Sequence, residues 1–334
     1  MDQLGVTIGD AASAFAFLGD EVRFAILESL YDRTAEAGPL TTSATYSQIR
    51  EDAGVADSGR FSYHLDKLTG PFIAKTDDGY RLRESGREVV KLYRTGILSS
   101  EPTFEPREID VDCYRCGSTV RVGYDNGHLL TQCPECPGLF TRPGVPDGML
   151  TALGYPPSGM WASGSTADPI DDGPGSGSTG DTAGGGTTDG RPGPAIDLNT
   201  AFERAHVRAN GFVAMMGRGF CPRCGGDVTA TLDPCRDHEA DGVCDSCGLW
   251  HPAFTQLACE VCGQPRLTHP LHVVHDRPPV AGVLEEHGAD RGWDRFAELM
   301  RWSTTVRETD VVVDAPAGDR FVVPIDDPTE VEKR

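Results

Sequence analysis

Apolar positions recur at helical spacing through residues 10–98, a stretch that contains no cysteine. Val22, Ile26 and Leu30 lie on one face of a predicted helix, since residues three or four apart share a helical face. Asp20 precedes this helix, and its carboxylate can accept hydrogen bonds from the free N–H groups of the first turn. The pattern predicts an α-helical start to the domain.

Two short helices joined by a tight turn are predicted next. Thr45 and Gln48 fit a capping box, with Ser47 as an alternative cap. Gly54 suits the left-handed conformation that ends many helices, and one of residues 57–58 (Asp-Ser) caps the helix that follows. This order predicts a helix-turn-helix.

The second of these helices, SGRFSYHLDKL (residues 58–68), has two different faces. Phe61, Leu65 and Leu68 lie at i, i+4 and i+7 and should face the core. The other face carries an arginine, hydroxyls and a phenol near the helix N-terminus, and these side chains suit a DNA groove. His64 flanks the core face, so its side chain either packs in the core or contacts a DNA phosphate.

A β-hairpin is predicted directly after this helix. Asp78-Gly79 between two β-prone runs is a strong hairpin signal, and a hairpin that follows a helix-turn-helix is a wing. Basic residues flank the turn on both sides. The candidate DNA contacts on the helix and wing are Ser58, Arg60, Ser62, Tyr63, His64, Lys67, Lys75, Arg81 and Arg83.

Three separated segments, FLGDEVRFAIL, SGRFSYHLDKL and KTDDGYRL, follow one another in an order and spacing that resemble the ArsR-type winged helix-turn-helix regulators. The resemblance covers roughly the first hundred residues. It implies a domain that binds double-stranded DNA and is usually homodimeric. Because residues 1–100 contain no cysteine, the chain departs here from the metal-sensing members, which puts metal sensing in this domain in doubt.

Ten of the eleven cysteines form C-x-x-C pairs, and four of the five pairs are followed by glycine. Such turns suit tetrahedral zinc, which takes soft ligands at about 2.3 Å. Disulfides are rare in a reducing cytosol, whereas iron is an alternative occupant of thiolate sites. The first two pairs predict a zinc ribbon over residues 107–142, with ligands Cys113, Cys116, Cys133 and Cys136.

The remaining seven cysteines, in residues 221–262, allow more than one pairing. The favoured, local pairing uses every cysteine and predicts two further structural zinc ions. Its groups are Cys221, Cys224, Cys235 and His238, then Cys244, Cys247, Cys259 and Cys262. The competing pairing joins Cys221 and Cys224 with Cys244 and Cys247, and gives Cys259 and Cys262 to His269 and His272 or to Cys235 and His238.

The sequence thus predicts an α+β multidomain protein with about three zinc ions. A winged helix-turn-helix (10–98) and the ribbon (107–142) precede a disordered Gly/Ser/Asp linker (157–195), whose composition offers little to bury. A zinc-binding α+β region (196–325) follows. It should start with a helix over 196–217 and end, over 278–325, with one or two helices and a strand–turn–strand around Pro316 and Gly318.

Charge changes the picture of the partner, because the formal net charge is −21. The chain has 32 Asp but four Lys, a balance that resembles proteins of extremely halophilic archaea. Residues 1–100 hold 11 Lys and Arg against 15 Asp and Glu, so most of the excess lies farther along the chain. In concentrated salt, counterion release contributes little to DNA binding and bulk repulsion is screened. We therefore expect DNA binding that depends on short-range contacts.

These features favour a DNA-binding transcription regulator in the cytoplasm. No apolar run is long enough to span a membrane, and no signal peptide begins the chain. No common catalytic motif appears, and Pro270 should interrupt any helix that carries His269, His272 and His275, so we expect no enzyme. A basal transcription factor similar to the TFE/TFIIE-alpha class, acting through contacts with RNA polymerase and the transcription machinery, is the alternative.

Overall fold

The computed structural model describes residues 15–37, 43–97, 103–141, 144–154, 197–239, 242–290 and 292–334. The chain divides into two compact units, Met1–Ser100 and Glu101–Arg334. Each unit has a hydrophobic core of its own. The predicted linker over 157–195 lies outside the described residues.

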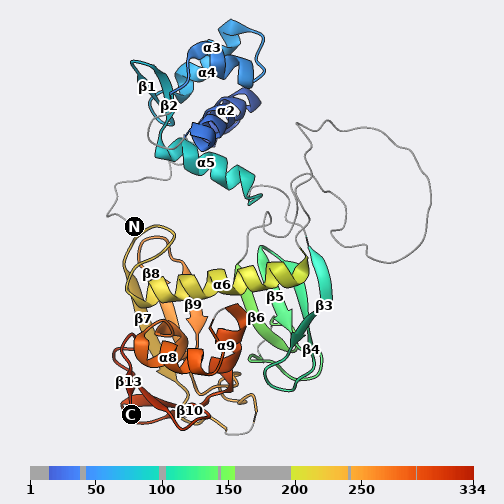
Figure 1. Cartoon of the computed structure of the whole chain (residues 1–334), viewed down its shortest axis with the longest axis vertical. Helices are drawn as coiled ribbons and strands as arrows, with labels where there is room; N and C mark the ends of the chain where they lie inside the picture. The colour runs from blue at the N-terminus through green and yellow to red at the C-terminus, as the bar shows by residue number, and fades with distance from the viewer. Residues whose placement is uncertain are drawn as a thin grey trace, which may run out of the picture. The chain divides into compact units, whose positions relative to one another are not determined.

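The N-terminal unit groups its helices together, with a small hairpin at one side of them (Figure 1). The long helix α2 packs against α3, α4 and α5, and Ile26 and Leu27 on it are fully buried. Strands β1 and β2 pair antiparallel around Asp77 and Asp78. The elements are α2 (Glu21–Ala37), α3 (Tyr46–Asp52), α4 (Ser58–Leu68), β1 (Ile73–Thr76), β2 (Gly79–Leu82) and α5 (Glu84–Arg94).

Helix caps occur where the sequence places them. The Asp20 carboxylate accepts a hydrogen bond from the Val22 N–H at 2.9 Å. Thr45 and Gln48 form the reciprocal capping box at the start of α3, which confirms Thr45 as the cap. The capping residue of α4 is Asp57. These caps fix where each helix begins, because they satisfy N–H groups that lack a partner within the helix.

In its described residues, the C-terminal unit contains three antiparallel sheets and four helices. The first sheet holds β3 (Phe104–Asp112), β4 (Thr119–Asp125), β5 (His128–Gln132) and β6 (Met149–Gly154) in that order. The second holds β7 (Val228–Pro234), β8 (Ala253–Cys259) and β9 (Pro265–Thr268), and the third β10 (Ser303–Val306), β11 (Asp310–Asp314), β12 (Arg320–Pro324) and β13 (Glu332–Lys333). The helices are α6 (Leu198–Gly217), α7 (Pro270–Val273), α8 (Pro278–Glu286) and α9 (Gly292–Arg301).

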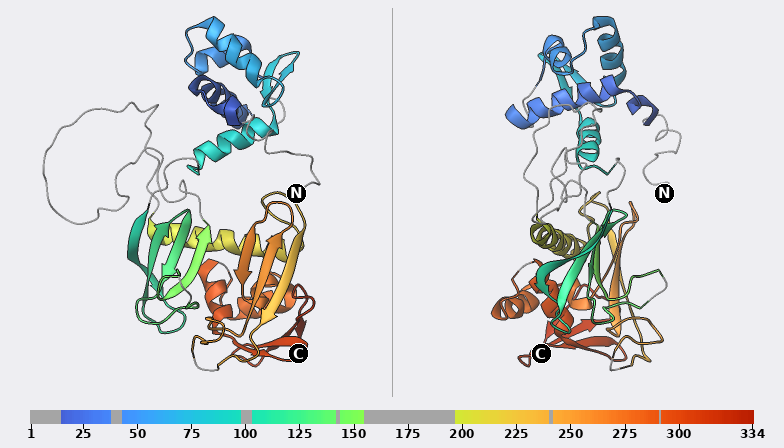
Figure 2. Two further views of the ribbon diagram at one scale, coloured as in Figure 1. Left: turned by 180° about the vertical axis from the view of Figure 1, so that it is seen from behind. Right: turned by 90° about the vertical axis from the view of Figure 1, so that its right-hand side faces the viewer.

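One hydrophobic core joins these elements, with α6 running along the first two sheets (Figures 1 and 2). Tyr124 of β4 and Phe202 of α6 belong to this same core, as do Trp302 and Phe321. The two cysteine regions were expected as separate modules over 107–142 and 196–325, but the structure gives them one core. The inner side chains of β4 and β5 pack into the shared core instead of ending within a small ribbon.

The tail agrees with its predicted order of helices and strands. Helices α8 and α9 precede β11 and β12, and Gly318 takes a φ of 97° in the turn between the strands. Strands β10 and β13 were not foreseen. Pro270 occupies the first position of the one-turn helix α7, which needs no N–H donor, so His269 lies before this helix and His275 after it. As predicted, no helix of the described chain carries all three histidines.

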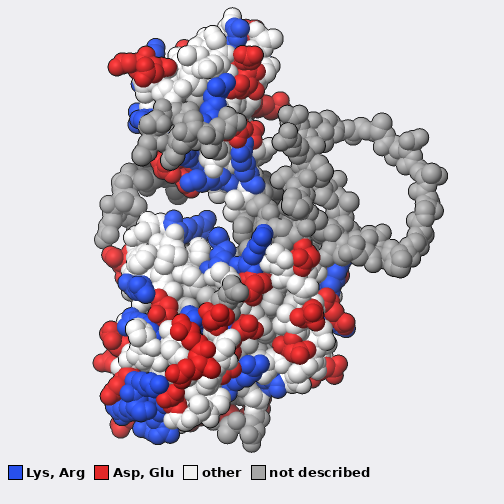
Figure 3. All heavy atoms as spheres, in the orientation of Figure 1, with Lys and Arg blue, Asp and Glu red and all other residues white. Residues whose placement is uncertain are grey.

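Acidic side chains are spread over the face of the C-terminal unit drawn in Figure 3, with Lys and Arg between them. None of the helices in the described part of the chain combines the length and the apolar character that crossing a bilayer requires.

Candidate metal centres and nucleic-acid surface

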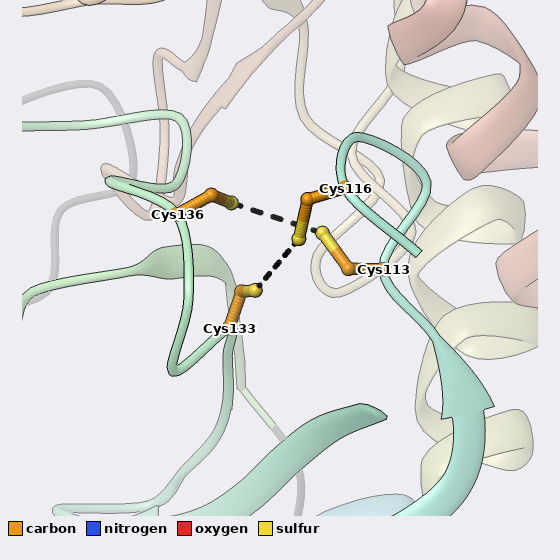
Figure 4. A group of neighbouring side chains, drawn as sticks. All are labelled: Cys113, Cys116, Cys133 and Cys136. Carbon is orange, nitrogen blue, oxygen red and sulfur yellow. Dashed lines mark hydrogen bonds between the residues drawn. The ribbon is translucent and has the colours of Figure 1, made fainter. Parts of the chain in front are cut away.

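The first cysteine group lies at one end of the β4–β5 hairpin (Figure 4). The sulfurs of Cys113 and Cys136 are 3.8 Å apart, and those of Cys116 and Cys133 are 3.4 Å apart. A disulfide would place them at about 2.05 Å. Four thiolates around a tetrahedral ion with metal–sulfur bonds of about 2.3 Å lie about 3.8 Å from one another. The structure thus brings the four predicted cysteines together at distances that fit a metal ion.

The glycine after the second cysteine has the same role in all four C-x-x-C-G turns. At Gly117, for example, φ is 75° and the N–H donates to the Cys113 carbonyl at 2.9 Å. The Cys113 N–H in turn donates to the Ser118 carbonyl at 2.8 Å. A side chain would strain this left-handed backbone. The pattern C-x-x-C-G therefore encodes a tight turn that directs both sulfurs to one side.

The second cysteine group corrects the predicted local pairing. Cys221, Cys224, Cys259 and Cys262 come together, with sulfur–sulfur distances of 3.8 Å between Cys221 and Cys262 and 3.4 Å between Cys224 and Cys259. Neither the favoured nor the competing pairing contained this set. The twelve residues predicted as ligands are those that form the three groups, but their assignment to the second and third groups was wrong.

Strand geometry explains the correction. Strand β7 separates Cys224 from Cys235, and seven residues at about 3.4 Å each extend for more than about 20 Å. These two cysteines therefore lie at opposite ends of the strand and cannot share an ion. Antiparallel pairing of Val228 with Cys259 brings the outer cysteine pairs together instead. Strand-like alternation in DVTATLDP was the signal that could have revealed this.

The third group, Cys235, His238, Cys244 and Cys247, lies in the connection between β7 and β8. His238 Nδ1 is 3.5 Å from the Cys247 sulfur, while Nε2 lies 3.0 Å from the Trp250 carbonyl. A carbonyl can only accept, so Nε2 carries the proton and Nδ1 keeps a free lone pair. This outer hydrogen bond orients the imidazole as a metal ligand.

Backbone and hydroxyl donors prepare several thiols to lose their protons. The Ser118 hydroxyl lowers the pKa of Cys116 to about 6. Backbone N–H groups, that of Glu239 foremost, lower the pKa of Cys244 to about 7. The pKa of Cys259 is also lowered to about 7 by backbone N–H groups, chiefly that of Cys262. Burial raises the pKa of Cys136 to about 12. Each group thus combines ready thiolates with thiols whose protons a bound metal would displace.

Helix α4 divides into a buried and an exposed face. Phe61, Leu65 and Leu68 are buried as predicted. His64 is buried too, and its Nδ1 accepts a hydrogen bond from Arg23 Nε at 3.2 Å. As a candidate DNA contact His64 is therefore corrected to a packed core residue. Helical phase explains this burial, because His64 lies three residues after Phe61 and four before Leu68, on the same face of α4.

Most of the other predicted contacts on α4 are exposed. Ser58, Arg60 and Lys67 face outward, and the Tyr63 side chain is 56% exposed, with the Lys67 ammonium 5.8 Å from its ring centre. Ser62 is half-buried, and its hydroxyl lies 2.8 Å from that of Tyr46. The structure thus gives α4 an exposed surface that combines positive charge, a phenol and a hydroxyl.

Among the described residues of this unit, some basic residues pair with a carboxylate, and the predicted Lys and Arg contacts with DNA do not. Arg33, Arg87, Lys91 and Arg94 form ion pairs with carboxylates. Within the described residues, the five predicted basic contacts have no carboxylate within the 4.0 Å of an ion pair. These unpaired cations are Arg60, Lys67, Lys75, Arg81 and Arg83.

Register separates the basic residues of the hairpin. Lys75 lies opposite Tyr80, and Arg81 lies opposite Ala74. Because neighbouring positions along a strand point to opposite faces, Lys75 and Arg81 project from different sides. The tip carries Asp77 and Asp78, so positive charge lies along the strands and not at the turn.

Apart from His238 of the third group and the more exposed His128 and His287, the histidines of the C-terminal unit are buried core residues. His269 Nε2 lies 3.0 Å from the Thr304 hydroxyl and His272 Nε2 lies 2.9 Å from the Asn210 carbonyl oxygen. Both imidazoles are buried, and burial holds the pKa of each well below its usual range. Hydrogen bonds occupy both side chains, which excludes them from the second metal group.

Comparison with known families divides the chain in the same way as the structure. Residues 11–93 match a family described as a domain of unknown function (DUF7347), and residues 194–331 match a second one (DUF7351). No curated protein and no solved structure matches the chain. The first match falls in the N-terminal unit and the second in the C-terminal unit, and the first cysteine group lies outside both. Both family descriptions leave the function open.

Proposed function

We propose that the protein is a DNA-binding transcription regulator whose N-terminal unit is a winged helix-turn-helix. Helices α3 and α4 would form the helix-turn-helix, and the β1–β2 hairpin would be the wing. The observation that carries this proposal is the set of five unpaired cations on α4, on the hairpin and, for Arg83, directly after it. Elsewhere in the unit, arginine and lysine side chains mostly pair with carboxylates.

Helix α4 would act as the recognition helix in this proposal. Arg60 and Tyr63 lie in its first two turns, where recognition helices contact base edges. An arginine fork can donate two hydrogen bonds to guanine, and the exposed Tyr63 phenol adds an apolar surface and a polar tip. Lys75 on one face of the hairpin and Arg81 on the other would contact DNA phosphates. The acidic tip of the hairpin would point away from the DNA backbone.

We further propose zinc as the resident ion of all three groups. Zinc prefers four thiolate or imidazole ligands in a tetrahedral arrangement, and a site with four protein ligands leaves no position open for a substrate. The ions would therefore hold the C-terminal unit together instead of catalysing a reaction. Elemental analysis of the purified protein should give close to three zinc ions per chain. Iron in place of zinc would contradict the proposed metal but not the three sites.

The DNA proposal is tested with a double variant, Arg60→Ala with Tyr63→Ala. Genome-wide crosslinking of the tagged protein supplies the duplexes, and fluorescence anisotropy measures their affinity. Loss of a good base contact costs about 1–3 kcal/mol, so we expect the dissociation constant to rise at least about tenfold. Arg94→Ala is the matched control, because Arg94 is a cation of the same unit that is already paired with Glu28 and Asp32.

Equal affinity in the double variant and the wild type, with unchanged circular dichroism, would remove α4 as the recognition helix. A homodimer, which the ArsR resemblance implies, should protect two half-sites about one helical turn apart. Co-purification with RNA polymerase, together with the absence of any sequence-selective footprint, would favour the basal transcription factor instead.

A further inference from the structure

A pocket of about 660 Å³ lies in the C-terminal unit between the first and second sheets. Its sides are β6 and β9, the edge strands through which the two sheets face each other (Figure 2), and α6 contributes a third wall. Small-molecule sites usually measure about 300–1,000 Å³. The pocket therefore has the volume of a binding site for a small organic molecule.

Most of the pocket wall is apolar. Both sheets, α6 and α9 contribute aliphatic or aromatic side chains, so a ligand would lose most of its contact with water on binding. Apolar walls with a few polar groups are typical of ligand pockets. Prominent among the lining residues are Leu130, Met149, Leu153, Phe212, Phe254 and Phe296.

The buried histidines of the wall are neutral and already hydrogen-bonded. His206 Nδ1 donates to the Phe202 carbonyl at 2.9 Å, and its Nε2 lies 3.4 Å from the Thr151 hydroxyl. Asn210 Nδ2 donates to the Gly292 carbonyl, so the amide oxygen of Asn210 must accept from His272 Nε2 at 2.9 Å. Burial lowers the pKa of His206 to about 4. This part of the wall therefore offers neither charge nor a metal ligand.

Positive charge enters the pocket from two arginines. The guanidinium carbons of Arg208 and Arg266 lie 4.8 and 5.6 Å from the ring centre of Phe212. Neither forms an ion pair with a carboxylate in the described part of the chain, and the exposed Asp125 at the end of β4 is the single acidic residue among the lining residues. Burial, and then the neighbouring charge of Arg208, lower the pKa of Arg266. An anion here would offset two like charges gathered beside an apolar chamber.

We infer that this pocket binds a small organic anion that has an apolar body, with the charged group held by Arg208 and Arg266 and the body enclosed between β6, β9 and α6. The apolar wall of the pocket matches the body of such a ligand, and the two arginines match its charged group. The inference concerns the C-terminal unit alone and is independent of the proposed DNA binding.

Two fluorescent probes with the same aromatic body test the inference on the full chain. Anilinonaphthalene-8-sulfonate carries an anionic group, and N-phenyl-1-naphthylamine does not. We expect saturable binding of one sulfonate probe per chain. Arg208→Met with Arg266→Met should weaken the sulfonate at least about tenfold, since charge-assisted hydrogen bonds are the stronger ones, and should weaken the neutral probe less than about threefold.

Two further variants locate the site. Ala209→Phe fills the pocket from α6 and should weaken both probes, while Arg204→Met removes an exposed arginine of the same helix that does not line the pocket and should change neither. Metal content and tryptophan emission check the fold of each variant. The inference is overturned if no saturable binding occurs, if the double arginine variant weakens both probes equally, or if a folded Ala209→Phe variant binds the sulfonate normally.

Discussion

The two units of this protein differ in what stabilises the fold of each. The N-terminal unit has an apolar core, capped helices and no cysteine, whereas the C-terminal unit adds to its core three groups of residues that could hold metal ions. The charge differs in the same way, because residues 101–334 carry −17 of the net −21. On this contrast we propose that contact with a polyanion and metal-dependent folding belong to separate parts of the chain.

Removal of the metals should produce the largest effect and should be confined to the C-terminal unit. A structural zinc site contributes apparent binding energy of about 10–16 kcal/mol, which is as large as the whole stability of a typical domain, about 5–15 kcal/mol. All four tryptophans follow residue 100, and Trp293 and Trp302 are buried. A strong chelator should therefore shift tryptophan emission to that of exposed indole while part of the helical circular dichroism remains. Unchanged tryptophan emission after complete metal removal would contradict the contrast between the units.

Pairs of substitutions should identify which cysteines share an ion. In the observed grouping, Cys221→Ser with Cys259→Ser damages one site and leaves two ions per chain. Cys221→Ser with Cys244→Ser damages two sites and leaves one. The local pairing would lose two ions in both variants, and the competing pairing would lose two in the first and one in the second. Elemental analysis of the two proteins therefore separates all three arrangements.

Acid should weaken the C-terminal unit through its buried histidines. Burial lowers the pKa of His206 to about 4 from an ordinary value of 6.5, so below pH 6.5 the unfolded state binds a proton that the folded state does not. Stability is then complete above pH 6.5 and is lost as the pH falls toward 4. Between pH 7 and pH 5 the loss is about 2 kcal/mol.

His206→Gln isolates this contribution from that of the metal ligands. Urea denaturation followed by tryptophan emission gives the free energy of unfolding at pH 7 and at pH 5. Between these two pH values the variant should lose about 2 kcal/mol less of this free energy than the wild type. An identical slope in the two proteins would mean that His206 is not the source.

The smallest predicted effect concerns a helix cap in the N-terminal unit. Asp57 accepts hydrogen bonds from the N–H groups of Gly59 and Arg60 at 2.8 and 3.0 Å, and these bonds lower the pKa of its carboxyl group. Asp57→Ala should slightly destabilise this unit and speed amide exchange at both N–H groups, with or without metal. Asp66→Ala, which removes the same charge from the exposed face of α4, should leave that exchange unchanged.

Local signals in the sequence predict much of the fold. The capping box at Thr45, the left-handed glycine at Gly54 with a φ of 65°, and the hairpin at Asp78-Gly79 each depend on residues a few positions apart. The first metal group is equally local, because a single hairpin separates its two cysteine pairs. Such features are readable because short-range geometry alone determines them.

Long-range features were harder to predict. Cys221 and Cys262 meet because β7 and β8 pair along their full length, and their C-x-x-C spacing carries no trace of that pairing. The pocket depends on two edge strands from different sheets, and Arg208 and Arg266 lie 58 residues apart along the chain. Hydrophobic periodicity identifies elements, but it does not show which edges will face each other.

One titration tests most directly whether the two units have separate roles. The affinity of a crosslinking-derived duplex is measured for three proteins, namely the wild type with metal, the wild type after chelation, and the Arg60→Ala, Tyr63→Ala variant with metal. We expect chelation to change the dissociation constant less than about threefold per site and the double substitution to raise it at least about tenfold, in line with a lost base contact. Loss of binding on chelation combined with normal binding by the variant would contradict the assignment of DNA recognition to α4.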